Sequence, residues 1–288
     1  MVNCAHMHTL RDALDWAEEK KVAIGHFNVS DSVQFEAIVE AARDLSVPVM
    51  IGVSEGERTW IGIEEIAALV KVEREKGISV FLNADHTHTV DAVAVALAAG
   101  FDEVLFDGSR LSLEENITTT KGVVESAHAR AEPALVEGEL GYIGLSSEVR
   151  EGVPDDLKMT EPSEAVQFVG ETGIDLLAPA VGNIHGMMKD GTDPALDIPR
   201  IQAIADAVSV PLVLHGASGN SDADITAAIE AGVRIVHINT EIRAAYREGI
   251  EEGLSANPNE VAPYKFMAAG KEAVKALVMA KLRLFNNL

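Results

Sequence analysis

Apolar, β-branched runs alternate with amphipathic segments along the whole chain. The apolar runs have the length of strands, and the segments between them carry hydrophobic residues at helical spacing. This alternation predicts repeated βα units with a parallel sheet, rather than a β-sandwich or a helical bundle. We expect eight strands, at 22–29, 47–54, 79–86, 103–106, 134–139, 174–180, 210–214 and 234–239.

The same pattern predicts helices outside the eight units. A preliminary helix is expected from Leu10 to Glu19, and the chain from Thr240 to Leu288 is amphipathic and helical after its last strand. No Pro/Ser/Gly linker or charge block divides the sequence. We therefore predict one α/β domain over 1–288, a (β/α)₈ barrel with extra N-terminal and C-terminal helices.

Composition and net charge exclude some classes of binding partner. The chain has 288 residues, of which 47% are hydrophobic, so it can bury a substantial core. Its net charge of −23, with no basic patch, argues against nucleic acid or an anionic membrane as a partner. No signal-like or membrane-spanning stretch is recognisable, so we expect a cytoplasmic protein. The single cysteine, Cys4, can form no internal disulfide.

Several of the expected strands end in residues that carry chemistry. Because the carboxyl ends of barrel strands meet at one face, these side chains are expected at a common mouth. They are Asp85, His86, Asp107, Glu139, His185 and His215. Three imidazoles with an open fourth position form a recurrent ligand set for catalytic zinc, and the two further acids could hold a second metal or orient the ligands.

Two glycine-rich strand exits favour an anion site. Gly186 follows His185, and 216–219 reads Gly-Ala-Ser-Gly, so backbone amides can approach an anion closely. Thr240, at a helix start, can add its hydroxyl and amide. Phosphate bound near the last two strands is a frequent barrel arrangement. The polar loop from Gly141 to about Pro162 is long for a barrel and is expected to be a mobile lid.

These motifs resemble those of the class II, zinc-dependent ketose-bisphosphate aldolases. The resemblance runs in order through nearly the whole chain. It rests on Phe27-Asn28-Val29, Asp85-His86, Phe106-Asp107-Gly108-Ser109, Glu137-Gly138-Glu139-Leu140-Gly141, Gly182-Asn183-Ile184-His185-Gly186 and Leu214-His215-Gly216-Ala217-Ser218-Gly219. It implies a barrel that assembles as a homodimer or homotetramer and cleaves a ketose phosphate reversibly to dihydroxyacetone phosphate and an aldehyde. Fructose 1,6-bisphosphate is the favoured substrate, and tagatose 1,6-bisphosphate is an alternative.

The resemblance also implies roles for individual residues. His86, His185 and His215 would hold catalytic zinc, Asp107 and Glu139 would match a second metal position, and Asp85 would be the acid/base residue. The remaining matches concern the substrate. Asn28 and Ser54 would line its pocket, and the C1 phosphate, with a monovalent cation nearby, would be held by Gly186, Lys189, Gly216, Ser218, Asn239 and Thr240.

The sequence departs from the family pattern at the proton donor. Family members usually carry a loop glutamate that transfers the carbon-bound proton. Its position is occupied here by Ser147, and Glu148 is the next residue. We therefore expect Glu148 to transfer this proton instead.

A second departure concerns the distal half of the sugar. His237 stands where the family has asparagine, and Tyr264, followed by Lys265, stands where it has an arginine. Arg243 or Arg247 of a partner subunit could compensate. A distal group other than phosphate, such as a carboxylate, stays open.

Other classes of function compete with the aldolase. A Schiff-base aldolase needs a lysine inside a barrel strand, and the eight expected strands contain none. A metal-dependent hydrolase could use His86-Thr87-His88, although amidohydrolase barrels place such a motif after the first strand. A non-catalytic phosphosugar-binding barrel is the third class, because a fold alone does not establish activity.

Overall fold

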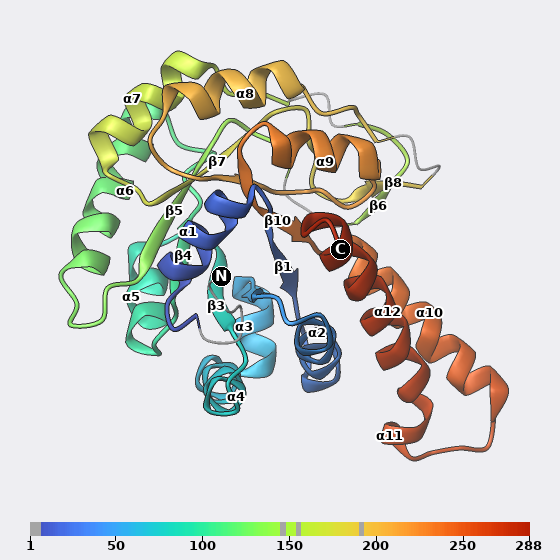
Figure 1. Cartoon of the computed structure of the whole chain (residues 1–288). Helices are drawn as coiled ribbons and strands as arrows, with labels where there is room; N and C mark the ends of the chain where they lie inside the picture. The colour runs from blue at the N-terminus through green and yellow to red at the C-terminus, as the bar shows by residue number, and fades with distance from the viewer. Residues whose placement is uncertain (1–6, 145–147, 154–156, 190–192) are drawn as a thin grey trace.

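The computed structural model describes residues 7–144, 148–153, 157–189 and 193–288 (Figure 1). Eight parallel strands close into a barrel in the order β1-β10-β9-β7-β5-β4-β3-β2, which confirms the expected fold class. The barrel strands are β1 (Ile24–Asn28), β2 (Val49–Val53), β3 (Val80–Thr87), β4 (Glu103–Phe106), β5 (Leu135–Leu140), β7 (Leu176–Pro179), β9 (Leu212–Leu214) and β10 (Val233–Ile238). Each lies within or next to an apolar run recognised in the sequence.

Helices surround the barrel as the amphipathic segments predict. They are α1 (Leu10–Lys20), α2 (Ser32–Leu45), α3 (Glu55–Ile61), α4 (Ile63–Glu75), α5 (Val90–Ala98), α6 (Leu113–His128), α7 (Pro162–Thr172), α8 (Ile198–Ala207), α9 (Asp222–Glu230), α10 (Thr240–Ala256), α11 (Pro263–Phe266) and α12 (Ala268–Phe285). Two elements were not expected. One is α3, and the other is a two-stranded sheet of β6 (Val149–Arg150) and β8 (Met187–Met188), whose strands are too short to show a period.

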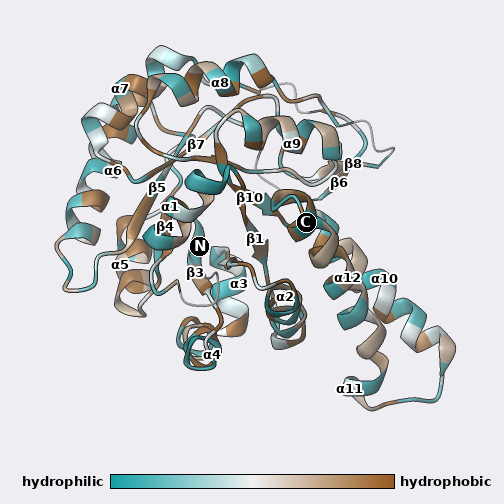
Figure 2. Ribbon diagram, in the orientation of Figure 1, coloured by the Kyte–Doolittle hydropathy of each residue, from teal (hydrophilic) through white to brown (hydrophobic). Residues whose placement is uncertain are grey.

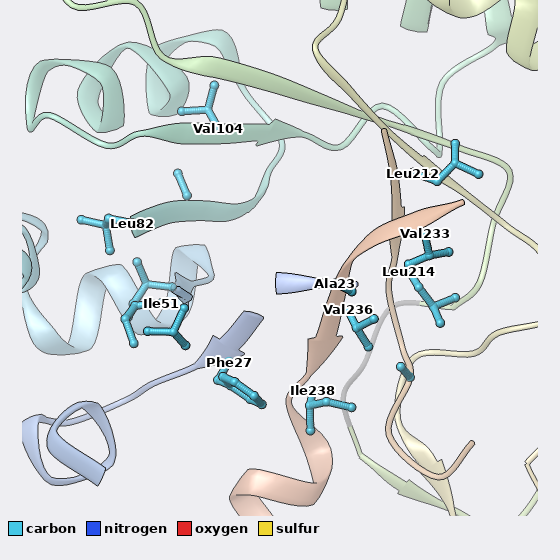
Figure 3. Close-up of a cluster of buried hydrophobic side chains, with 14 of the residues drawn as sticks. Ala23, Phe27, Ile51, Leu82, Val104, Leu212, Leu214, Val233, Val236 and Ile238 are labelled. Carbon is cyan, nitrogen blue, oxygen red and sulfur yellow. The ribbon is translucent and has the colours of Figure 1, made fainter. Parts of the chain in front are cut away.

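The main core lies between the strands and the helices. Outward-facing strand side chains such as Phe27, Ile51, Leu82 and Val104 are at most 1% exposed (Figure 3). Hydropathy follows the same division, with brown strands inside and teal patches on the outer helix surfaces (Figure 2). Burial of such side chains contributes about 1.5–3 kcal/mol each, so this layer supplies much of the stability.

A second, smaller apolar cluster closes one end of the barrel, and we call it the floor. Helix α1 lies across this end (Figure 1) and buries Leu10, Leu14 and Trp16. They pack against residues near the beginnings of strands, namely Ile24, Met50, Phe81, Leu135, Leu176 and Ile235. Glu18 of the same helix pairs with Arg234 at the start of β10. The floor therefore joins the first helix to the last strand.

The C-terminal helices form an arm that extends away from the barrel (Figure 1). Helices α10 and α12 pack against each other, and α11 lies at the far end. Lys271 and Lys275 in the first half of α12 pair with Glu40 of α2. None of the helices in the described ranges is long and apolar enough to cross a membrane.

Candidate active site

The mouth of the barrel is organised by a bulge in β3. Ala84 pairs with Val104 and Thr87 with Phe106, so two residues of β3, Asp85 and His86, face one residue of β4. His86 has a φ of 42°, which is uncommon for a residue other than glycine. In a regular strand consecutive side chains point to opposite faces, but the bulge re-aims them. Both Asp85 and His86 therefore line the mouth.

A buried arginine holds this bulge in place. Arg58 of α3 donates from Nη1 to the carbonyls of Val53 (2.6 Å) and Asp85 (3.2 Å), and from Nη2 to the hydroxyl of Thr87 (3.0 Å). It is 7% exposed. The unexpected helix α3 thus delivers the side chain that fixes the end of β3.

Three imidazoles meet at the mouth. The rings of His86, His185 and His215 have centroids 4.7 to 6.0 Å apart, and one nitrogen from each lies within 4.8 Å of the others. His86 Nδ1 also lies 2.9 Å from Asp107 Oδ2 and 3.4 Å from Glu139 Oε2. The structure thus brings together all five residues for which the sequence suggested metal binding.

The electrostatics of this cluster fit a divalent cation. Burial lowers the pKa of His215 to about 3 and that of His185 well below its ordinary value, so both rings are neutral donors. Burial also acts to lower the pKa of His86, but Asp85, Asp107 and Glu139 outweigh it and raise that pKa to about 10. The Oε2 atom of Glu139 is buried and makes no hydrogen bond to the described residues. Neutral imidazoles beside carboxylates that favour positive charge form a donor set suited to such a cation.

Asp85 is buried beside the imidazoles and is held by Asn28. Its Oδ2 accepts a 2.8 Å hydrogen bond from Asn28 Nδ2, while its Oδ1 has no hydrogen-bond partner in the described part of the chain. Burial acts to raise the pKa of Asp85, but the neighbouring His86 and His26 outweigh it and hold that pKa below its usual value. The side chain is therefore an ionised carboxylate with one oxygen available, as a general base requires.

Polar residues within four of the barrel strands form a buried layer at and beneath the mouth. The expected strand ranges contain these residues, but no role was assigned to His26, Glu103 or Glu137. His26 and His237 stack with ring centroids 3.4 Å apart, and Glu137 Oε1 lies 2.6 Å from His215 Nε2. Burial, together with the charge of Glu137, raises the pKa of Glu103 well above its ordinary value. Burial raises that of Glu137 to about 8. The Glu137 contact fixes the ring orientation of His215.

The glycine-rich exits form a backbone cradle. Gly186 and Gly216 have φ of 97° and 57°, and a Cβ at either would lie within 2.5 Å of a backbone carbonyl oxygen. Ser218 Oγ accepts from the amides of Asn239 (3.3 Å) and Glu241 (3.4 Å) at the start of α10. Close backbone approach at a helix N-terminus suits an anion.

These features enclose a pocket of about 260 Å³. Its lining contains most of the expected site residues, namely Asn28, Ser54, Asp85, His86, Asp107, His185, Gly186, His215, Gly216, Ser218, His237, Asn239 and Thr240. It also contains Glu55, Gly56, His88 and Gly144, which the sequence did not assign to the aldolase site. Arg243 lines the pocket as well, whereas the sequence suggested it only as a contribution from a partner subunit. His88 belongs to none of the closely spaced metal-ligand groups among the described residues.

Some expected site residues do not line this pocket. Glu148 is exposed just before β6, and its carbonyl accepts from the amide of Met187. The Lys189 side chain is 71% exposed and pairs with Glu151 at 3.4 Å. Tyr264 is 78% exposed and lies with Lys265 on α11, at the far end of the arm. Ser147 lies outside the described residues.

Comparison with known proteins assigns the family. Residues 8–288 match the sequence profile of the fructose-bisphosphate aldolase class-II family. The chain belongs to that family. A probable fructose-bisphosphate aldolase of Bacillus subtilis is 35% identical over 97% of both chains, and a sulfofructosephosphate aldolase of Alkalicoccus urumqiensis is 33% identical over 95% and 94%.

Solved structures agree with this assignment. The YdjI aldolase of Escherichia coli K12 is 32% identical over 96% of both chains, with a TM-score of 0.82. Membership of the class II aldolase family implies a divalent metal, and the donor set at the mouth of this barrel fits one.

Proposed function

We propose that this protein cleaves a ketose 1-phosphate reversibly to dihydroxyacetone phosphate and an aldehyde, with fructose 1,6-bisphosphate as the leading candidate substrate. The observation that carries the proposal is the joint placement, in one pocket, of three imidazoles, a buried ionised Asp85 and a backbone cradle for an anion. The family match favours it over a hydrolase or a non-catalytic barrel.

The residues at the mouth divide the chemistry between them. Asp85 accepts the proton of the C4 hydroxyl through its available Oδ1, while Asn28 keeps the other oxygen in place. Electrons of the C3–C4 bond then pass to the dihydroxyacetone phosphate half as the aldehyde leaves. His86, His185 and His215 would hold a divalent cation, which would supply Lewis-acid polarisation of the substrate carbonyl when bound.

Other residues hold the substrate and the metal in position. We assign the C1 phosphate to the amides around Gly186 and Gly216, with Ser218 and Thr240 at the start of α10. The nitrogen-rich ligand set favours zinc, and Asp107 with Glu139 offers a second metal position beside His86.

Removal of the metal tests the proposal. Exhaustive dialysis against a chelator should abolish the release of triose phosphate from fructose 1,6-bisphosphate, and added Zn²⁺ should restore it. Borohydride with substrate should leave the enzyme active, because the eight barrel strands contain no lysine to form an imine. Full activity after chelation, or inactivation by borohydride, would exclude this mechanism.

A further inference from the structure

His237, near the end of β10, is a buried side chain of the pocket that the proposed mechanism does not use. Its Nδ1 atom lies 3.8 Å from Asp85 Oδ1, the oxygen assigned to the C4 hydroxyl of the substrate. This distance is too long for a direct hydrogen bond. A hydroxyl oxygen that lies about 2.8 Å from one of the two atoms can, however, lie at the same distance from the other. Asp85 and His237 therefore form a two-point site for a single hydroxyl group.

Two other imidazoles hold the His237 ring in place. The His26 ring stacks on it, with centroids 3.4 Å apart and planes 4° apart, and the His215 ring lies with its centroid 3.9 Å away. His26 and His237 are register partners on β1 and β10. Gly52 of β2 leaves room for this stack, because a Cβ at that position would overlap the His26 ring. The His237 ring cannot turn without displacing its neighbours, so its Nδ1 atom stays beside Asp85.

The environment of His237 favours a proton on Nδ1. Burial lowers the pKa of His237 well below its ordinary value, so the ring is neutral and carries one N–H. The Nε2 atom is buried and has no hydrogen-bond partner in the part of the chain that the structure describes, whereas Nδ1 faces the carboxylate of Asp85. A proton on Nε2 would be buried without an acceptor, which costs free energy. A neutral imidazole N–H can polarise an oxygen atom without giving up its proton.

We propose that His237 donates a hydrogen bond from Nδ1 to the oxygen on C4 of the ketose, the same oxygen whose proton Asp85 removes. The inference rests on the proposed function. As the C3–C4 bond breaks, its electron pair passes to the dihydroxyacetone phosphate half, and the C4 oxygen becomes the carbonyl oxygen of the aldehyde. His237 keeps its own proton and stabilises the negative charge on that oxygen during the step. In the condensation direction the same N–H polarises the aldehyde carbonyl, and Asp85 returns the proton.

Two measured reactions separate this role from a structural one. Cleavage of fructose 1,6-bisphosphate forms both products, whereas exchange of the carbon-bound proton of dihydroxyacetone phosphate with solvent involves no aldehyde. His237→Phe keeps a ring for the stack and removes the N–H. It should lower kcat/KM for cleavage about 10- to 100-fold, because one hydrogen bond to the developing charge is lost. The exchange rate should change by less than about threefold, and the content of bound Zn²⁺ should equal that of wild type.

Two further substitutions at this position guard against distortion of the stack. His237→Leu is smaller than the phenylalanine variant and also lacks the N–H, so it should show the same selective loss of cleavage. His237→Asn retains an N–H donor on a shorter side chain, and it should recover part of the cleavage rate.

His26→Phe is the matched control. It makes the same substitution in the same stack, at a ring that does not line the pocket. The ratio of cleavage to exchange in this variant should lie within about threefold of the wild-type ratio.

Three results would contradict the inference. Cleavage at the wild-type rate in both His237→Phe and His237→Leu would overturn it. An equal fall in cleavage and exchange would also overturn it, because His237 would then act on the dihydroxyacetone phosphate half or on the metal ligands, and the aldolase activity of the wild-type enzyme would stand. Absence of carbon–carbon cleavage with every ketose phosphate, in wild-type enzyme loaded with Zn²⁺, would instead overturn the proposed function and this inference with it.

Discussion

The two ends of the barrel are built from the same eight strands and differ in almost every other respect. At the floor, α1 and the beginnings of the strands bury apolar side chains such as Leu14 and Phe81. At the mouth, the ends of the strands bury carboxylates and imidazoles, with a bulge at Asp85 and His86. Polar atoms there, including Asp85 Oδ1, lack a hydrogen-bond partner among the described residues.

This difference separates the stabilising end from the reactive end. A buried polar atom without a partner costs about 1–3 kcal/mol, so the groups at the mouth act against folding. Apolar burial at the floor and in the outer layer offsets that cost. Substitutions at the floor should therefore change stability with little effect on catalysis, and substitutions at the mouth should do the opposite.

The largest expected effect is at the floor. Leu14 is 2% exposed within the apolar cluster, and Leu14→Ala should lower the free energy of unfolding by about 2–5 kcal/mol, because it removes methyl groups and leaves a cavity. Urea denaturation measures this loss. The kcat/KM of the folded enzyme should stay close to that of wild type. A large change in kcat/KM with unaltered stability would show that the two ends are not separable in this way.

The next effect is at the mouth. Asp85→Asn should lower kcat/KM at least about 100-fold, because an amide cannot accept the hydroxyl proton. Bound metal should remain at its wild-type level, because Asp85 is not one of the three imidazole ligands. Activity near that of wild type would show that Asp85 is not the base. Loss of bound metal would show that Asp85 affects activity by positioning the imidazole ligands.

The smallest effect is expected at the rim. We propose that Glu148 exchanges the carbon-bound proton of dihydroxyacetone phosphate, although its side chain is exposed and does not line the pocket in this structure. Glu148→Gln should slow exchange of that proton with solvent about 10-fold or more, without altering stability. Glu151→Gln is a matched control on the same segment. Exchange at the wild-type rate in the first variant would assign the step to another group.

The barrel could be predicted from the sequence because each strand produces an apolar run of its own. Residues at strand ends were predictable for the same reason, since one rule places every carboxyl end at the mouth. The placement of Asp107 and His215 at the mouth could be predicted from where an apolar run stops, without any knowledge of side-chain contacts.

Residues that support the site from helices were not predictable in this way. Glu57 and Arg58 look like ordinary charged positions near a helix start, where acid in the first turn or a solvated arginine is common. Arg243 was expected only as a contribution from a partner subunit, and not as a partner of Glu57 within one chain. Their burial or pairing depends on the distance between α3 and α10, which no local pattern records. Likewise, Glu103 within an apolar strand gave no sign that Glu137 would lie near it inside the barrel.

The floor also imposes an order on the folding of a newly made chain. Glu18 in α1 meets Arg234 at the start of β10, 216 residues later in the sequence. At 5–20 residues per second, the ribosome needs roughly 10 to 40 s to make the intervening chain. During that interval the apolar face of α1 cannot complete its packing on the closed ring. A nascent chain therefore presents Leu14 and Trp16 to chaperones before its own last strand can cover them.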